Sequence, residues 1–225
     1  MDIQLHFEKR GSGPALLLLH GNGENNTYFV HQIQEFSEDF TVYAIDTRGH
    51  GKSPRGTAPF TLSQFADDLL QFMDAQGLPV ADILGFSDGG NIALLFALRH
   101  PERVRRLILN GANLDPKGVK PSVQLPVVAG YHLSRFLRAP HIKTELLGLM
   151  VNEPHIAPAE LSRLTMPVLV IAGEKDMIRD DHTRLIAASI PGAHLAIIPG
   201  DHFIANKAPV AFNRAVRAFF KEESL

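Results

Sequence analysis

The chain of 225 residues has no cysteine, no tryptophan and almost no charge bias. Without cysteine, disulfide scaffolds, thiolate zinc sites, iron–sulfur ligation and a sulfur nucleophile are excluded. The 22 basic residues are matched by 24 acidic ones, so we expect neither a nucleic-acid nor a membrane partner. Long apolar segments are also missing, since the run Ala15–Leu19 is far too short to cross a bilayer. These absences together favour a soluble, cytoplasmic protein.

Short apolar runs alternate with helical patterns along the chain. Alternation of this kind predicts an α/β fold with a mostly parallel sheet and helices on both faces. Strands are expected at Ile3–Glu8, Ala15–His20, Thr41–Asp46, Asp82–Phe86, Val104–Asn110, Val168–Gly173 and His194–Ile198. Helices are expected at Thr61–Gln76, Asp88–Arg99, Asp181–Ser189 and Lys207–Phe220.

One segment breaks the alternation. From residue 114 to 164 the chain has several prolines and no strand-like run, but two helical patches at Val123–Leu137 and His141–Val151. A long insertion between strands of a compact domain is usually functional or a small subdomain. The sequence therefore predicts a core domain, 1–113 and 165–225, with a helical lid at 114–164.

The strongest local signal is ILGFSDGGN at 83–91, where a buried strand gives way to an apolar helix. Gly85 and Gly89 flank Ser87 in a G-x-S-x-G pattern, which suits a strained strand-to-helix turn. Such a turn lifts the serine hydroxyl clear of the sheet and aims the first helical N–H groups at a developing oxyanion. Ser87 is thus the candidate nucleophile.

A serine nucleophile needs a base, and the base needs an orienting carboxylate. In open α/β sheets these groups are expected past the carboxyl ends of later strands. Asp176 follows one such strand and His202 follows the next. The order Ser87, Asp176, His202 predicts a triad, with Asp201 and Asp115 as less favoured acids.

With these motifs the sequence resembles the α/β-hydrolase fold family over nearly its whole length. The lid is the least similar part. HGNGEN at 20–25 matches the oxyanion loop of that family, and Asp46–Ser53 matches its D-x-R-G-x-G-x-S loop. A nearer similarity is to the valacyclovir-hydrolase-like (biphenyl-hydrolase-like) branch, through G-x-S-D-G-G, Gly111–Asn113 and GEKD. The resemblance implies an oxyanion hole made by the backbone N–H groups of Asn22 and Asp88.

The same branch implies that the side chain of Asp88 holds a substrate ammonium group. The alternative is that Asp88 only stabilises the positive N-terminus of its helix. Glu24 belongs to the loop that is expected beside Ser87, so its carboxylate would also favour a cation. Lys117, Lys120, Arg135 and Arg138 in the lid would instead attract an anion, unless they face bulk water.

The sequence gives little support for two other kinds of site. A dinucleotide site is disfavoured because the third glycine of its fingerprint falls at Asn26. The eleven histidines form no HExxH pattern, so neither a metal nor a cofactor is expected. His20 and His50 are interpreted as structural.

The expected function is hydrolysis of a small carboxylic ester through an acyl-enzyme, with amino-acid esters as one candidate substrate class. The alternatives are a lactonase, a carbon–carbon bond hydrolase, a cofactor-free haloperoxidase and a non-catalytic ligand-binding protein, since one fold hosts all of these. The sequence does not determine the oligomeric state.

Overall fold

The structure, a computed structural model, describes residues 2–138 and 140–222. Its centre is a seven-stranded sheet in the order β1-β3-β2-β4-β5-β6-β7. The strands are β1 (Phe7–Arg10), β2 (Ala15–Leu19), β3 (Thr41–Ile45), β4 (Ala81–Phe86), β5 (Val104–Asn110), β6 (Val168–Gly173) and β7 (His194–Ile198). Only β1 pairs antiparallel within this sheet, so the predicted mostly parallel sheet is confirmed.

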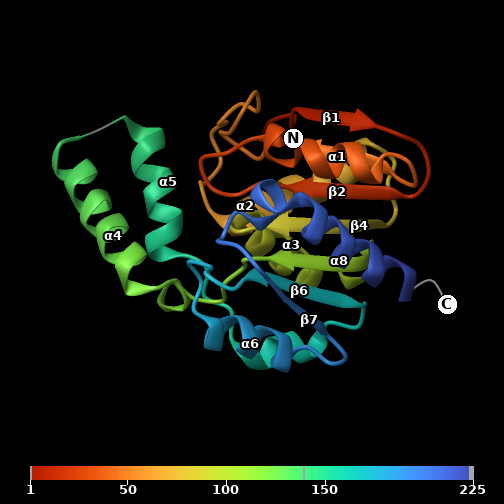
Figure 1. Cartoon of the computed structure of the whole chain (residues 1–225). Coiled ribbons are helices and arrows are strands. Elements are labelled where there is room, and N and C mark those ends of the chain that lie inside the picture. Colours follow the sequence, from red (N-terminus) through yellow and green to blue (C-terminus); the bar gives the residue numbers. More distant parts are fainter. Residues whose placement is uncertain (1, 139, 223–225) are drawn as a thin grey trace.

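Helices cover both faces of the sheet (Figure 1). One face carries α1 (Val30–Phe36) and α8 (Pro209–Glu222), and the other carries α2 (Leu62–Ala75), α3 (Asp88–Arg99) and α6 (Asp180–Ser189). Strand β2 shows how the two faces are made, because Leu16 and Leu18 pack into one core while Leu17 and Leu19 pack into the other. This is the two-residue period of a strand buried on both sides.

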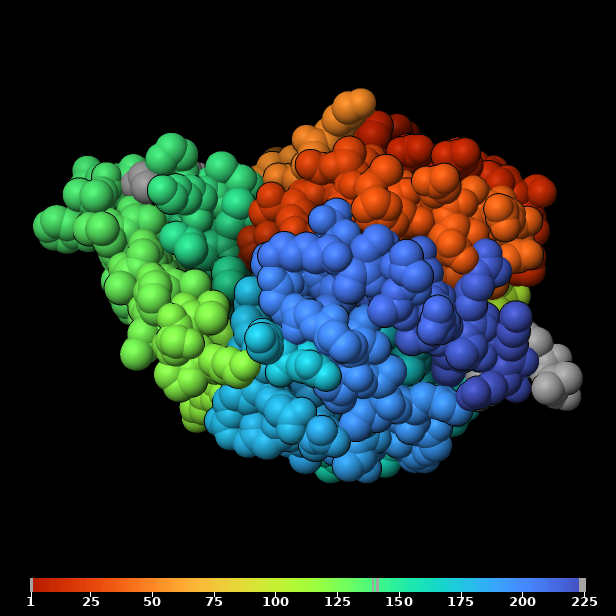
Figure 2. Space-filling view, in the orientation of Figure 1, coloured from red at the N-terminus to blue at the C-terminus, as the bar shows by residue number. Residues whose placement is uncertain are grey.

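The segment predicted as a lid contains two antiparallel helices, α4 (Pro121–Phe136) and α5 (His141–Asn152). Figure 2 shows this hairpin as a lobe beside the main body. The rest of the segment returns to the core, where Leu161 and Leu164 are buried. Short helices complete the chain: η1 (Asn26–Phe29), η2 (Pro101–Arg103), η3 (Pro116–Gly118), η4 (Pro158–Arg163) and α7 (Ile204–Lys207).

The strand order explains where a site can form. From β2 the chain runs outward to β3 on one side, and from β4 it runs outward to β5 on the other. The carboxyl ends of β2 and β4, which are neighbours, therefore flank the switch point at which open α/β sheets bind ligands. No helix among the described residues is both long and apolar enough to span a membrane.

Candidate active site

Ser87 occupies the turn between β4 and α3 in a strained conformation. Its φ of 53° and ψ of −120° lie in a region that residues with side chains rarely adopt. Both flanking glycines are needed for this turn. A Cβ on Gly85 would lie 2.3 Å from the Gly89 carbonyl oxygen, and one on Gly89 would lie 2.1 Å from the Leu19 carbonyl oxygen. The backbone is packed so closely here that the serine is held at the carboxyl end of β4.

His202 and Asp176 form a buried hydrogen-bonded pair. The imidazole Nδ1–H donates to Asp176 Oδ1 at 2.6 Å, and the same carboxylate oxygen accepts from the Ile178 amide at 2.9 Å. The two other acids are engaged elsewhere, Asp201 with Lys207 and Asp115 with His155. The acid that reaches the imidazole is therefore the one expected from chain order.

The end of β5 brings this pair to Ser87. The Ser87 amide donates to the Asn110 carbonyl at 2.8 Å. The next residue, Gly111, lies so close to His202 that a Cβ there would be 2.7 Å from the imidazole Cε1. Ser87 and His202 thus both lie at the carboxyl end of β5, and Asp176 is joined to His202. Among the described residues, no hydrogen bond joins the side chains of Ser87 and His202.

The loop after β2 lies against the serine. A Cβ on Gly21 would be 3.2 Å from Ser87 Cβ. The next residue is Asn22, and Asp88 begins α3 directly after the serine. Both lie beside Ser87 in one cavity, where their backbone N–H groups were expected. The side chain of Asn22 also donates to Asp88 Oδ2 and to the Leu146 carbonyl of α5, each at 2.9 Å, so it links the loop to the lid.

The cavity at Ser87 has a volume of about 30 Å³. It is bounded by Asn22, Ser87, Asp88, Asn113, Val119, Met150, Glu153, Met177 and Ile178. This volume holds about two water molecules, and Ser87 itself is only partly buried. Met150 of α5 forms part of one wall. Outside it, an open groove of about 570 Å³ between the hairpin and Phe60 also reaches Glu153.

Two carboxyl groups bound the cavity, and only one of them was expected. Burial raises the pKa of Asp88, against hydrogen bonds from Asn22 and Asn91 that lower it. Burial likewise raises the pKa of Glu153, and the charge of Asp88 raises it further. The Glu153 carboxylate accepts a hydrogen bond from the Leu62 amide at 2.7 Å. Since the charge of Asp88 disfavours ionisation of Glu153, a cation between the two carboxyl groups would be stabilised. No pattern in the sequence singles out Glu153.

Glu24 does not bound this cavity. Burial raises the pKa of its carboxyl to about 7, while a hydrogen bond with the Gly21 backbone and the charge of His202 act in the opposite direction. The charge of His202 thus acts on Glu24, and Glu24 does not join Asp88 at the Ser87 cavity as a second acid.

The loop that carries Asn22 is braced by buried polar groups. His20 Nδ1–H donates to the Gly21 carbonyl at 2.7 Å, and its Nε2 accepts from the Thr47 amide at 3.0 Å. Burial lowers the pKa of His20 to about 4, so the ring is neutral at pH 7. Asp46 accepts from the Asn26 amide at 2.7 Å. His50 Nδ1–H donates to the Arg48 carbonyl at 2.9 Å, so these residues tie the two loops together.

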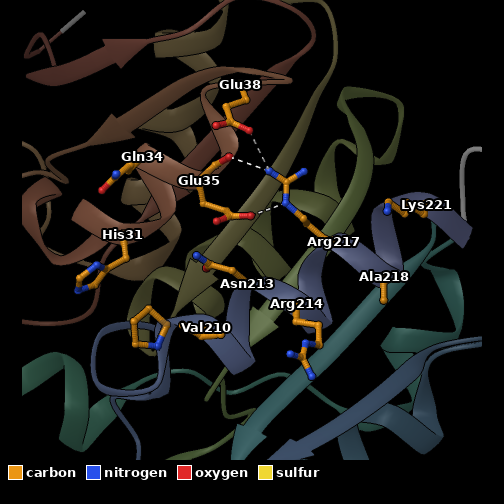
Figure 3. A pocket seen from close by; sticks show the side chains of 11 residues that line it. His31, Gln34, Glu35, Glu38, Val210, Asn213, Arg214, Arg217, Ala218 and Lys221 are labelled. Atoms are coloured by element: carbon orange, nitrogen blue, oxygen red, sulfur yellow. Dashed lines mark hydrogen bonds and ion pairs between the residues drawn. The ribbon is translucent and has the colours of Figure 1, made fainter.

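Of the lid cations, Lys120 lies near the triad, where its Nζ donates to the Asp176 carbonyl at 2.5 Å. The described residues contain no cluster of His, Asp and Glu able to hold a metal ion. A larger hollow of about 690 Å³ lies between α1 and α8, where Arg217 is ion-paired with Glu35 and Glu38 (Figure 3). None of its lining residues bounds the Ser87 cavity.

Comparison with known proteins agrees with this architecture. A family model described as the alpha/beta hydrolase fold matches residues 14–139. The putative carbamate hydrolase RutD of Caulobacter sp. (strain K31) is 30% identical over 98% of this chain and 97% of its own. Human serine hydrolase BPHL is 28% identical over 97% of this chain and 84% of its own.

Among solved structures, the enol-lactonase from Burkholderia xenovorans LB400 has a TM-score of 0.83 over 97% of both chains. At 22% identity, this likeness bears on the fold alone. The resemblance and the hydrolase class predicted from the motifs are confirmed. The chain therefore belongs to the α/β-hydrolase fold family.

Proposed function

We propose that this protein is a serine hydrolase that cleaves small carboxylic esters through an acyl-enzyme on Ser87. The proposal rests mainly on one observation. The strained serine between β4 and α3 lies at the same strand end as an imidazole hydrogen-bonded to a buried carboxylate at 2.6 Å. Such strain is seldom kept in a folded protein without a functional reason.

The chemistry follows from these positions. Ser87 Oγ attacks the ester carbonyl as His202 takes its proton, and Asp176 holds the imidazole in the correct tautomer and stabilises its cation. The oxyanion is stabilised by the backbone N–H groups of Asn22 and Asp88, the latter at the positive end of α3. His202 then gives its proton to the leaving alcohol, and water hydrolyses the acyl-enzyme.

Labelling with a fluorophosphonate tests the nucleophile. The native protein should be labelled on Ser87, and Ser87→Ala should lose labelling and on the order of a million-fold in turnover. Ser162→Ala is the matched control: that serine is exposed in η4, so its substitution should leave both properties unchanged. An unlabelled native protein, or a Ser87→Ala variant with full esterase activity, would overturn the proposal.

Within this class we propose a preference for amino-acid esters. The support is the buried carboxyl of Asp88 beside Ser87, together with Glu153 on the same cavity. A substrate ammonium group would neutralise two carboxyls that burial otherwise penalises. Asn22 and Asn91 hold the Asp88 side chain in place, at 2.9 and 3.3 Å.

The test compares an amino-acid ester with its des-amino analogue. A charged hydrogen bond of about 1.5–3 kcal/mol corresponds to roughly a 10- to 150-fold preference in kcat/KM. Asp88→Asn keeps the shape of the side chain and should remove most of this preference, and Glu153→Gln should remove part of it. Glu160→Gln, at an exposed residue of η4, should change nothing. If the preference is the same in all four proteins, neither carboxyl binds an ammonium group.

The same serine chemistry could act on a carbamate or a lactone. The name of the Caulobacter relative favours including a carbamate, and a lactone is an alternative predicted from the sequence, so both belong in one panel with acyl and amino-acid esters. A kcat/KM for a carbamate or lactone above that of every ester would replace the ester proposal while leaving Ser87 as nucleophile.

A further inference from the structure

Two polar groups beside His202 are buried without hydrogen-bond partners. Among the described residues, neither Glu24 Oε2 nor the hydroxyl of Tyr28 has a partner. The side chain of Tyr28 is only 8% exposed. Buried polar atoms are nearly always paired with protein or ordered water, and leaving them unpaired is costly. These two oxygens therefore point to a bound water molecule.

The position of Tyr28 is fixed by aromatic packing. Its ring stacks on Phe86 with centroids 4.4 Å apart and planes within 6° of parallel. Phe86 immediately precedes Ser87, and its ring centroid is 4.8 Å from that of His202. Tyr28 is thus held one ring away from the base.

Glu24 lies on the same side of the site. Its carboxyl hydrogen-bonds the Gly21 backbone, and Gly21 lies against both Ser87 and the Phe86 ring. After burial, the charge of Glu24 is the next cause that raises the pKa of the Tyr28 phenol. The charge of His202 in turn lowers the pKa of Glu24. The carboxyl, the phenol and the imidazole therefore form one cluster.

We propose that Glu24 and Tyr28 hold and orient the water molecule that deacylates Ser87. The assignment rests on the proposed acyl-enzyme function. The Tyr28 hydroxyl donates to one lone pair of the water oxygen, and the Glu24 carboxylate accepts one water proton. The second proton faces His202, and the second lone pair is free to attack.

The step is balanced. The water oxygen bonds to the acyl carbon as His202 Nε2 takes the proton that faces it. The tetrahedral intermediate then collapses, the bond between the acyl carbon and Ser87 Oγ breaks, and His202 returns the proton to Oγ. A carboxylic acid leaves. Acylation uses no water, so Glu24 and Tyr28 act in the second half of the reaction.

Rapid mixing with p-nitrophenyl acetate separates the two halves, because acylation releases the phenol and deacylation limits later turnovers. In Glu24→Gln and Tyr28→Phe, deacylation should slow by about 10- to 100-fold, the loss of one hydrogen bond to a reacting group. The acylation rate should stay within about threefold of native, which is a smaller change than the loss of one hydrogen bond to a reacting group would cause. Acetylated Ser87 should accumulate in intact-mass spectra.

Matched controls address folding. Tyr28→Phe keeps the ring stacked on Phe86, and Tyr43→Phe alters another buried tyrosine, in the opposite core cluster. Tyr43→Phe should leave both rates unchanged. Equal losses in acylation and deacylation would show a structural role, and unchanged deacylation would also refute the water assignment. A native protein that never acylates Ser87 would overturn the proposed function and this assignment together.

Discussion

Gly111 tests whether the position of the His202 ring controls activity. The residue has a φ of 62°, and a Cβ there would lie 2.7 Å from the imidazole Cε1 and 2.9 Å from Nδ1. Ordinary contact begins at 3.4 Å, so in Gly111→Ala the ring must retreat by about 0.7 Å. The ring is held by Asp176 and packed against Phe86, and it cannot retreat without changing its distance to Ser87.

A misplacement on the order of 1 Å costs about a hundredfold in rate, so we expect Gly111→Ala to lose about 30- to 100-fold in kcat/KM. The left-handed backbone adds about 1–2 kcal/mol of destabilisation, equivalent to about 2–8 °C in Tm. Gly192→Ala is the control, because its φ of 69° carries the same strain while no atom lies within 4 Å of the new Cβ. It should lose the same stability and none of the activity.

Ester turnover and thermal unfolding, measured on native protein and both variants, decide the matter. Equal activity in Gly111→Ala and Gly192→Ala would refute the reasoning, since strain would then be the only effect of the substitution. A fluorophosphonate rate that falls in parallel with ester turnover would locate the loss in the acylation step.

Three further outcomes are expected. Asp176→Asn should lower kcat on the order of ten-thousand-fold, the loss this change causes in a serine-protease triad, and a loss below tenfold would remove Asp176 from the role. His20 has a folded pKa of about 4 against 6.5 unfolded, so the unfolded state binds the extra proton and stability falls as pH drops between these values. In urea unfolding, the advantage of native protein over His20→Gln should shrink by about 2 kcal/mol from pH 7 to pH 5, and a constant advantage would show that the ring titrates normally. Arg48→Met leaves the buried carboxylate of Asp68, now 2.7 Å from the guanidinium, without its cation and should cost about 3–5 kcal/mol in the same assay. Adding Asp68→Asn should recover part of that loss, and a cost below about 1 kcal/mol would mean that water replaces the arginine.

The bounds of three strands were predictable because their signal is local. Val104–Asn110, Val168–Gly173 and His194–Ile198 have the predicted bounds, as apolar runs between turn residues allow. The first strand is Phe7–Arg10 rather than Ile3–Glu8. It is an edge strand with three exposed residues, so burial does not fix its register in the sequence.

Two helices show where local patterns fail. Helix α1 was not predicted, because its seven residues contain too few apolar positions to establish a 3.6-residue period. The predicted helix Lys207–Phe220 is interrupted before Pro209, which starts α8 instead. Proline has no backbone N–H to continue a helix but fits its first turn.

The candidate site likewise contains residues that local patterns predict and residues whose position depends on packing. Ser87, Asp176 and His202 follow strand ends, and a parallel sheet brings such ends together whatever the detailed packing. Glu153 could not be found because its approach to Asp88 depends on how the lid segment folds back. Glu24 was expected to bind a cation beside Ser87, but its place in the fold depends on how the loop after β2 packs, and it does not bound the Ser87 cavity.

The hairpin of α4 and α5 has a consequence for how this enzyme can change over evolution. Its two helices make their most extensive contacts with each other, and α4 with its C-cap exposes Leu125, Leu133, Phe136 and Leu137 to solvent. Substitutions there should change the free energy of unfolding of the sheet very little, since few core contacts depend on them. Residues on this hairpin nevertheless line the outer groove and close the cavity at Met150. Substitutions in the hairpin can therefore change the substrate preference without lowering the stability of the core that keeps Ser87 in its strained turn.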